Sequence, residues 1–229
     1  MEDDASKELP SSALGTLDYW ETTYATEMKN FQDHEDIGEV WFGGANSASV
    51  IKYICTQLAL SKESDRIVDL GCGNGWTCVQ LAKAGFKKLC GVDYSLKAVE
   101  LARKIAADED HPEIEFFVCD MVDGENQLKG TKDFKFKLAH DKGTYDAVGL
   151  CPDDPKQKRR KYIENVHSAI EDGGFFILVS CNWTKEELIE HFQDYFEFSQ
   201  QIPTKTLSFG GQTGNTVTIL VFVKKTRGQ

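Results

Sequence analysis

The chain has 229 residues, of which 41% are hydrophobic and 28% are charged, a balance typical of one globular domain. Its formal net charge of −11 disfavours nonspecific binding to a nucleic-acid backbone, which needs clustered Lys and Arg. No run approaches the roughly 18 consecutive apolar residues of a membrane helix. We therefore expect neither direct nucleic-acid binding nor a membrane span.

The first twelve residues are polar and acidic, unlike a secretory signal or a basic transit peptide. We expect a disordered acidic leader at 1–12 and a single domain at 13–229, with an N-terminal helical cap (13–60) and an α/β core (61–225). The seven cysteines stand singly in apolar strings, which favours reduced thiols in a cytoplasmic, or also nuclear, protein. We expect a monomer and no metal site.

Helical spacing of aromatic and polar residues predicts a helix over 14–36 and a second over about 46–60. Short apolar strands then alternate with amphipathic helices. Strands are expected at 66–70, 88–93 and 114–120, with a further strand region shared by "FKFKLAHD" and "DAVGLC". Helices are expected at "WTCVQLAKAG", at "SLKAVELARKIAADE" and at "KRRKYIENVHSAIEDGG", the last ending at Gly173.

The last third continues the pattern with a strand at 175–181 and a helix whose start is marked by Thr184 and, three residues on, Glu187, a capping box. The segments "FEFSQQI" and "TVTILVFVKK" form a closing strand pair around "SFGGQTGN". Repeated β-α units predict an α/β fold: a single Rossmann-like sheet, mostly parallel with an antiparallel edge strand, and helices on both faces.

A glycine-rich loop, "VDLGCGNGW", follows the first expected strand and opens a helix. Glycines there allow a positive φ and close approach of a ligand to the backbone, and ligands bind beyond the carboxyl ends of strands in such sheets. The spacing is G-x-G-x-G with Trp76 next, whereas the dinucleotide fingerprint is G-x-G-x-x-G. Together with Asp69 before the loop, this spacing is the one that S-adenosylmethionine enzymes use.

Two further acids follow the next two strands. Asp93 ends the second strand, where a carboxylate can accept the ribose hydroxyls. Asp120 ends the third, where it can accept the adenine amino group, with Met121 behind the ring. A single Asp at a strand end is usually a turn or cap residue. Three acids on three successive strands beside a glycine loop favour a cofactor site.

With these motifs the chain resembles the class I, seven-stranded S-adenosylmethionine-dependent methyltransferases over about residues 40–225, most specifically in "VDLGCGNG" and "GVDYS". The resemblance implies a seven-stranded sheet whose seventh strand is antiparallel. It also implies that the acceptor meets the methyl group at the end of the fourth strand, where "HDKGTYDAV" lies. The N/D-P-P-Y turn of many amino-group methyltransferases is missing there, which disfavours nucleobase or glutamine acceptors.

The segments "GEVWFG", "DKGT", "SCNWTKEEL" and "FGG-x-x-GN" resemble, in the same order, the protein-lysine methyltransferases of the methyltransferase-like group. That resemblance implies a protein substrate, a lysine of translation elongation factor 1-alpha, methylated with S-adenosyl-L-methionine, which leaves S-adenosyl-L-homocysteine. No metal is implied, because the sulfonium leaving group is already good and the enzyme mainly positions and desolvates the amine.

Residue roles follow from these motifs. The cofactor-binding residues are expected to be Trp41, Asp69, Gly71, Cys72, Gly73, Asn74, Gly75, Asp93, Tyr94, Asp120 and Met121. The substrate-contacting residues are expected to be Asn182, Trp183 and Phe209, the last with Gly210 and Gly211. The catalytic candidate is Asp141, as an acceptor that orients the lysine amine.

Several of these roles have a plain structural alternative. Asp141 could cap a turn, Trp183 could be core, and Trp41 with Phe42 could pack a helix rather than close over the cofactor. Two other functions also fit the fold: a small-molecule N- or O-methyltransferase, and a module that binds S-adenosylmethionine without turnover. A nicotinamide oxidoreductase is disfavoured by the glycine spacing.

Overall fold

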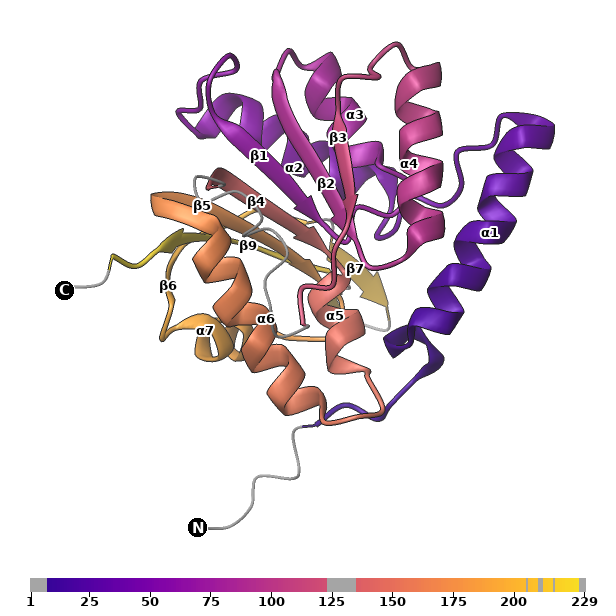
Figure 1. Ribbon diagram of the computed structural model, residues 1–229. Coiled ribbons are helices and arrows are strands. Elements are labelled where there is room, and N and C mark those ends of the chain that lie inside the picture. The colour runs from indigo at the N-terminus through magenta and orange to yellow at the C-terminus, as the bar shows by residue number, and fades with distance from the viewer. Residues whose placement is uncertain (1–7, 123–134, 205, 210–211, 216, 227–229) are drawn as a thin grey trace.

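The computed structural model describes residues 8–122, 135–204, 206–209, 212–215 and 217–226. Its centre is a seven-stranded sheet of order β3-β2-β1-β4-β5-β9-β6 (Figure 1). The strands are β1 (Arg66–Leu70), β2 (Lys88–Asp93), β3 (Glu115–Val118), β4 (Phe136–Lys142), β5 (Ile170–Ser180), β6 (Phe196–Gln201) and β9 (Thr218–Lys224). The helices are α1 (Leu17–His34), α2 (Gly44–Gln57), α3 (Trp76–Lys83), α4 (Leu96–Asp108), α5 (Thr144–Gly149), α6 (Pro155–Ala169) and α7 (Lys185–Phe192).

The strand directions confirm the expected sheet. Strands β1 to β5 pair in parallel, and β9 runs antiparallel to both of its neighbours, β5 and β6. The antiparallel strand β9 therefore lies second from the edge, with β6 outside it. A separate ladder joins β7 (Thr206–Phe209) to β8 (Gln212–Asn215). Within the described residues, no helix is long and apolar enough to span a bilayer.

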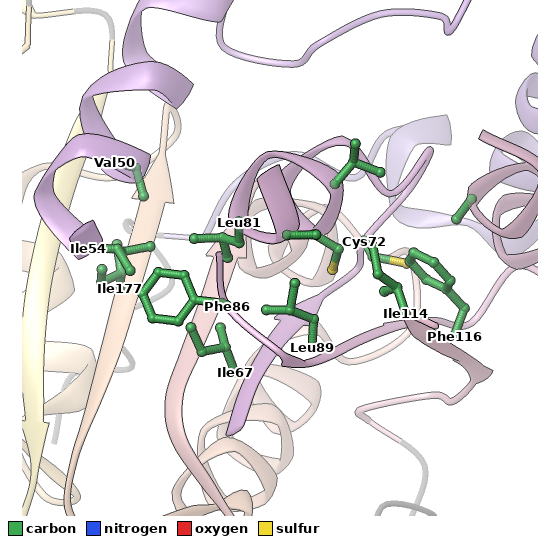
Figure 2. Close-up of a cluster of buried hydrophobic side chains, with 14 of the residues drawn as sticks. Val50, Ile54, Ile67, Cys72, Leu81, Phe86, Leu89, Ile114, Phe116 and Ile177 are labelled. Atoms are coloured by element: carbon green, nitrogen blue, oxygen red, sulfur yellow. The ribbon is translucent and has the colours of Figure 1, made fainter. Parts of the chain in front are cut away.

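Alternation along the strands divides the core into two layers. Ile67 of β1 and Ile177 of β5 face α2, α3 and α4, where they meet Ile54 and Leu81 (Figure 2). Their chain neighbours point to the opposite face, where α6 and α7 supply side chains such as Phe192. Burial on both faces explains why these strands are continuous apolar runs in the sequence.

The segment "DAVGLC" was wrongly assigned to a strand. Its first four residues belong to α5, and a turn follows. Gly143 adopts φ +87°, which lets the chain reverse, and the Asp141 carboxylate accepts the backbone N–H groups of Thr144 and Tyr145. A short apolar run fits a strand or a buried helix, so these local hydrogen bonds decide the outcome.

Helix α6 also differs from the prediction, because it ends at Ala169 rather than Gly173. Ile170 already has extended dihedrals and pairs with Phe136 of β4, so β5 begins earlier than position 175. The ladder then shifts register between Phe136 and Leu138. The capping box of α7 is present as expected, between Thr184 and Glu187.

The N-terminal segment lies against the core from its first described residue. The Glu8 carboxylate forms a two-pronged ion pair with Arg159 of α6, at 2.8 Å for both bonds. Ser12 N–H donates to the carbonyl of Leu150, and Leu9 packs against the α6 and α7 layer. The predicted leader therefore includes residues with defined contacts at 8–12, whereas residues 1–7 lie outside the described chain.

Candidate active site

The glycine loop joins β1 to α3 at the carboxyl edge of the sheet. Gly71 has φ +66°, and a Cβ there would lie 1.9 Å from Thr144 Oγ1. A Cβ on Gly73, at φ +54°, would lie 2.6 Å from the Tyr24 hydroxyl. Side chains are thus excluded by backbone conformation and by space. The loop backbone borders a cavity of about 460 Å³, within the ~300–1,000 Å³ range of small-molecule sites.

Asp93 holds this loop at the end of β2. One carboxylate oxygen accepts the N–H of Gly73 at 3.0 Å, and the other accepts the N–H of Ser95 at 2.9 Å. Only 5% of Asp93 is exposed, and burial raises its pKa to about 6 although both hydrogen bonds oppose the shift. The carboxylate lines the cavity, where its remaining lone pairs can accept ligand hydroxyls.

The loop after β3 forms the next part of the wall. One oxygen of Asp120 accepts the N–H of Val122 at 2.8 Å, and no described residue donates to its second oxygen. Met121, Cys119 and Tyr94 add apolar surface on the same side of the cavity. A carboxylate oxygen beside flat apolar surface suits a heteroaromatic ring that carries an amino group. These residues fit the adenine end of the expected cofactor.

Two of the expected cofactor residues do not line the cavity. Asp69 is 4% exposed and one of its oxygens lies 2.6 Å from Nδ1 of His140, its register partner on β4. Gly75 is the N-terminal cap residue of α3, and a Cβ there would meet Ala102 and Phe116. Asp69 and Gly75 thus flank the loop and contact the protein core instead of the cavity. The other nine border the cavity: Trp41, Gly71, Cys72, Gly73, Asn74, Asp93, Tyr94, Asp120 and Met121.

Asn74 also connects the glycine loop to the N-terminal part of the chain. Its side-chain amide donates to the carbonyl of Ile37 at 2.8 Å, which holds the loop against the segment before Trp41.

Asp141 is completely buried and faces away from the cavity. Its carboxylate accepts Thr144 N–H at 2.9 Å, Tyr145 N–H at 3.0 Å and the hydroxyl of Tyr162. Burial raises its pKa to about 7, against the effect of these three donors. This geometry favours the cap over the catalytic alternative, since a carboxylate with three buried donors and no exposure has no route to an acceptor amine.

The neighbours of Asp141 form the cavity wall instead. Lys142, Gly143 and Thr144 all line it, and Thr144 donates from its hydroxyl to the carbonyl of Leu70 at 2.8 Å. This bond joins the end of β4 to the start of the glycine loop. A Cβ on Gly143 would lie 2.8 Å from the ring of Phe42, so Phe42 closes directly over the turn.

Trp41 and Phe42 line the cavity, and Trp41 also packs against a helix. The ring of Trp41 lies edge-on to Trp20 of α1 with the centroids 5.4 Å apart, so the helix-packing role is present and the cofactor role stays a prediction. Phe42 has φ +63°, a conformation that is unusual for an aromatic residue. The tight turn into Gly43 thus presents both rings to the cavity.

The end of β5 supplies the far wall. Asp146 of α5 accepts the hydroxyl of Ser180 at 2.6 Å and the N–H of Cys181 at 2.8 Å, which holds Cys181 and Asn182 at the cavity. Trp183 points into the core instead, 4% exposed, with the Arg159 guanidinium 5.0 Å from its ring centre. The backbone of Phe209 belongs to β7, and its side chain and Gly210 and Gly211 lie outside the described residues.

Residues 14–17 and the aromatic face of α1 also border the cavity, although no sequence motif assigns them to it. Trp20 donates from its indole N–H to the carbonyl of Leu14 at 2.7 Å, which folds this segment back onto α1. The hydroxyl of Tyr24 approaches Gly73 from the same helix. The cluster of Tyr19, Trp20 and Tyr24 in one helix was the available signal, because a surface helix seldom carries so much aromatic area.

We call the lining at the ends of β1, β2 and β3 the cofactor half of the cavity. The lining at the ends of β4 and β5, from Lys142 to Thr144 together with Asp146, Cys181 and Asn182, is the acceptor half. The cofactor half combines a glycine cradle, two carboxylates and apolar surface, and this donor set fits S-adenosylmethionine.

Comparison with known proteins gives the family. The model of a methyltransferase domain family matches residues 61–221. EEF1A lysine methyltransferase 2 of Danio rerio is 40% identical over 95% of this chain and 90% of its own length, and the Homo sapiens protein of that name is 39% identical over 93% and 87%. The chain belongs to the EEF1A lysine methyltransferase 2 family.

A more distant relative and a solved structure extend the comparison. Protein-lysine N-methyltransferase EFM4 of Saccharomyces cerevisiae is 32% identical over 95% of this chain and 97% of its own length. The magnesium protoporphyrin IX methyltransferase of Synechocystis, solved with bound S-adenosylmethionine, superposes with a TM-score of 0.61 at 18% identity, covering 88% of this chain and 97% of that one. The latter likeness is one of fold, and the fold is that of the S-adenosylmethionine-dependent methyltransferases.

Proposed function

We propose that this protein transfers a methyl group from S-adenosylmethionine to a lysine of translation elongation factor 1-alpha. The observation that carries the proposal is the similarity to proteins named EEF1A lysine methyltransferase 2, which extends over at least 93% of the chain in fish, mouse and human. Similarity confined to the cofactor half would support only methyl transfer. Here it includes the acceptor half and the N-terminal segment that borders the cavity.

The cofactor half of the cavity would hold the methyl donor. The amides of the glycine loop and the carboxylates of Asp93 and Asp120 line the cavity and would bind the polar groups of the donor, and Met121 and Tyr94 would contact its ring. The bound donor supplies a methyl group on a sulfonium, a reactive centre with a good leaving group. Proximity and exclusion of water then become the main tasks of the protein.

The acceptor half would receive the lysine. A lysine amine with an ordinary pKa of about 10.4 must lose its proton before it can attack. Trp41 and Phe42 cover this part of the cavity with apolar surface, and desolvation there favours the neutral amine. Asn182 offers a side-chain oxygen that can accept an amine N–H. The hydrogen bonds of Asp146 to Ser180 and Cys181 hold Asn182 at the cavity wall.

Further features of the proposal follow from the sequence. The sulfonium chemistry calls for no metal, and in the described part of the chain no three His, Cys, Asp or Glu side chains form a metal-binding group. We further propose a monomer that acts in the cytoplasm, and also in the nucleus, without direct contact to nucleic acid. Full activity in the presence of a chelator would support the metal-free reaction.

Labelling of a cell lysate tests the substrate. The protein is incubated with S-adenosylmethionine that carries a labelled methyl group and with lysate from cells that lack this enzyme. We expect a labelled band at the size of elongation factor 1-alpha. Label found only in small amines or phenols would instead identify a small-molecule methyltransferase. Binding of the cofactor without any transfer would identify a non-catalytic module.

A further inference from the structure

Lys142 is the last residue of β4, and its side chain borders the cavity where the two halves meet. It alternates with Asp141, which points to the opposite face of the sheet. The side chain is half-buried. Cys72 of the glycine loop and Glu39 are near enough for their electrostatic effect to raise its pKa. No hydrogen bond or ion pair of its ammonium group is formed with any described residue.

The acids nearest to Lys142 have other partners. Asp69 is bonded to His140, and Asp141 accepts three donors on the far side of the strand. Glu39 is exposed and forms no ion pair with Lys142. Burial lowers the pKa of Lys142, although these acids act in the opposite direction. A partly desolvated ammonium without a counter-ion is unfavourable, so it favours an anionic group in the cavity.

Lys142 is one of two cationic side chains among the described residues that line the cavity. The other is Lys158 of α6. It donates to Cys151 Sγ at 2.8 Å, and the negative charges of Asp120 and Asp153 help to raise its pKa. Lys158 therefore belongs to the β3 side of the cavity, where the adenine end is expected. Lys142 is the cation beside the glycine loop and the end of β4.

We propose that Lys142 binds the carboxylate of the methionine part of S-adenosylmethionine. The inference rests on the proposed function. Asp93 and Asp120 occupy the ends of β2 and β3 and suit the ribose and the adenine, so the methionine part must extend toward β1 and β4. The carboxylate is the only anionic group of that molecule. Pairing it with Lys142 satisfies both charges at the place where, among the described residues, the cavity offers a free ammonium group.

In this pairing the carboxylate of the cofactor offsets the charge of Lys142. Lys142 acts here as a cofactor-binding residue and takes no part in proton transfer.

Two ligands that differ in one group test the pairing. Isothermal calorimetry measures the affinity of the full chain for S-adenosylmethionine and for decarboxylated S-adenosylmethionine, which retains the amino group but lacks the carboxylate. We expect Lys142→Met to weaken S-adenosylmethionine binding by about tenfold or more, the effect typical of a charged hydrogen bond. The affinity for the decarboxylated ligand should stay unchanged or rise. Lys158→Met, the matched loss of a cavity lysine, should not distinguish the two ligands.

Each other outcome has a definite meaning. Equal loss for both ligands would show that Lys142 acts through packing, and no loss for either would refute any contact; both overturn the pairing. If the unmodified protein binds neither ligand, the proposed function itself fails. Lys142→Gln and a thermal unfolding curve for each variant separate loss of binding from loss of fold. Intact-mass measurement after incubation with S-adenosylmethionine should find Lys142 unmethylated, and methylation there would overturn the pairing too.

Discussion

The cofactor half and the acceptor half of the cavity are built in different ways. The cofactor half relies on backbone: glycine conformations at Gly71 and Gly73, and an amide held by Asp93. The acceptor half relies on which side chains of one short turn face outward, and Asp141 faces inward while Lys142 and Thr144 face the cavity. Backbone-built sites tolerate little change, whereas the acceptor half can vary its chemistry on the same frame.

Loss of the Asp93 carboxylate should have the largest effect on ligand binding. Asp93→Ala leaves the buried N–H groups of Gly73 and Ser95 without their acceptor and removes the expected hydroxyl partner. We expect affinity for S-adenosylhomocysteine to fall by about 100-fold or more, measured by calorimetry. An unchanged affinity would refute the assignment of the cofactor half. Asp93→Asn, which keeps one acceptor oxygen, should lose less.

Loss of the Asp141 carboxylate should instead affect stability. Asp141→Ala leaves two buried amides of α5 and the Tyr162 hydroxyl unpaired, which should lower the free energy of unfolding by about 2–4 kcal/mol. Chemical denaturation measures this change. Cofactor affinity should stay within a fewfold of normal. A stable variant that binds cofactor but has lost transfer would return Asp141 to the catalytic role.

The pH dependence of stability supplies a second measure of Asp141. Its pKa is raised from 3.8 to about 7 in the folded protein, so the folded state keeps a proton that the unfolded chain releases. The contribution of this proton to the free energy of unfolding is therefore full below about pH 4, and it is lost as the pH rises to about 7. Asp141→Asn should flatten this part of the stability curve. An unaltered slope would show that the carboxylate does not titrate in that range.

The N-terminal segment gives the smallest expected effect. Arg159 pairs with Glu8 and lies over Trp183, so Arg159→Met should lower the free energy of unfolding by about 1–2 kcal/mol. Arg160→Met is the matched control on the same helix, because its pair with Glu164 is exposed and should contribute less than ~0.5 kcal/mol. Equal effects in thermal denaturation would mean that the N-terminal contact does not stabilise the fold.

The residues that line the cofactor half could be picked out of the sequence because their signals are local. Glycines that must lack a side chain, and an acid at or just after the ends of β1, β2 and β3, are visible in the sequence itself. Strands β1 and β2 and the capping box at Thr184 were predictable for the same reason, since apolar runs and cap residues depend on near neighbours.

The acceptor half was harder to predict because its roles depend on orientation. In "DKGT" the acid looks catalytic, yet alternation along β4 turns Asp141 into the α6 layer, where Tyr162 meets it. Trp183 likewise turns into the core against Arg159, a residue 24 positions earlier in the chain. The aromatic face of α1 reaches the cavity only through tertiary packing. None of these directions is encoded by spacing alone.

Methylation of purified elongation factor 1-alpha tests the central claim most directly. The factor is incubated with S-adenosylmethionine and either the unmodified protein or Asp93→Ala, and its peptides are then examined by mass spectrometry. We predict added methyl groups on a lysine with the unmodified protein and none with Asp93→Ala. An unmodified factor in a reaction where the same preparation binds S-adenosylmethionine would contradict the assignment of the substrate.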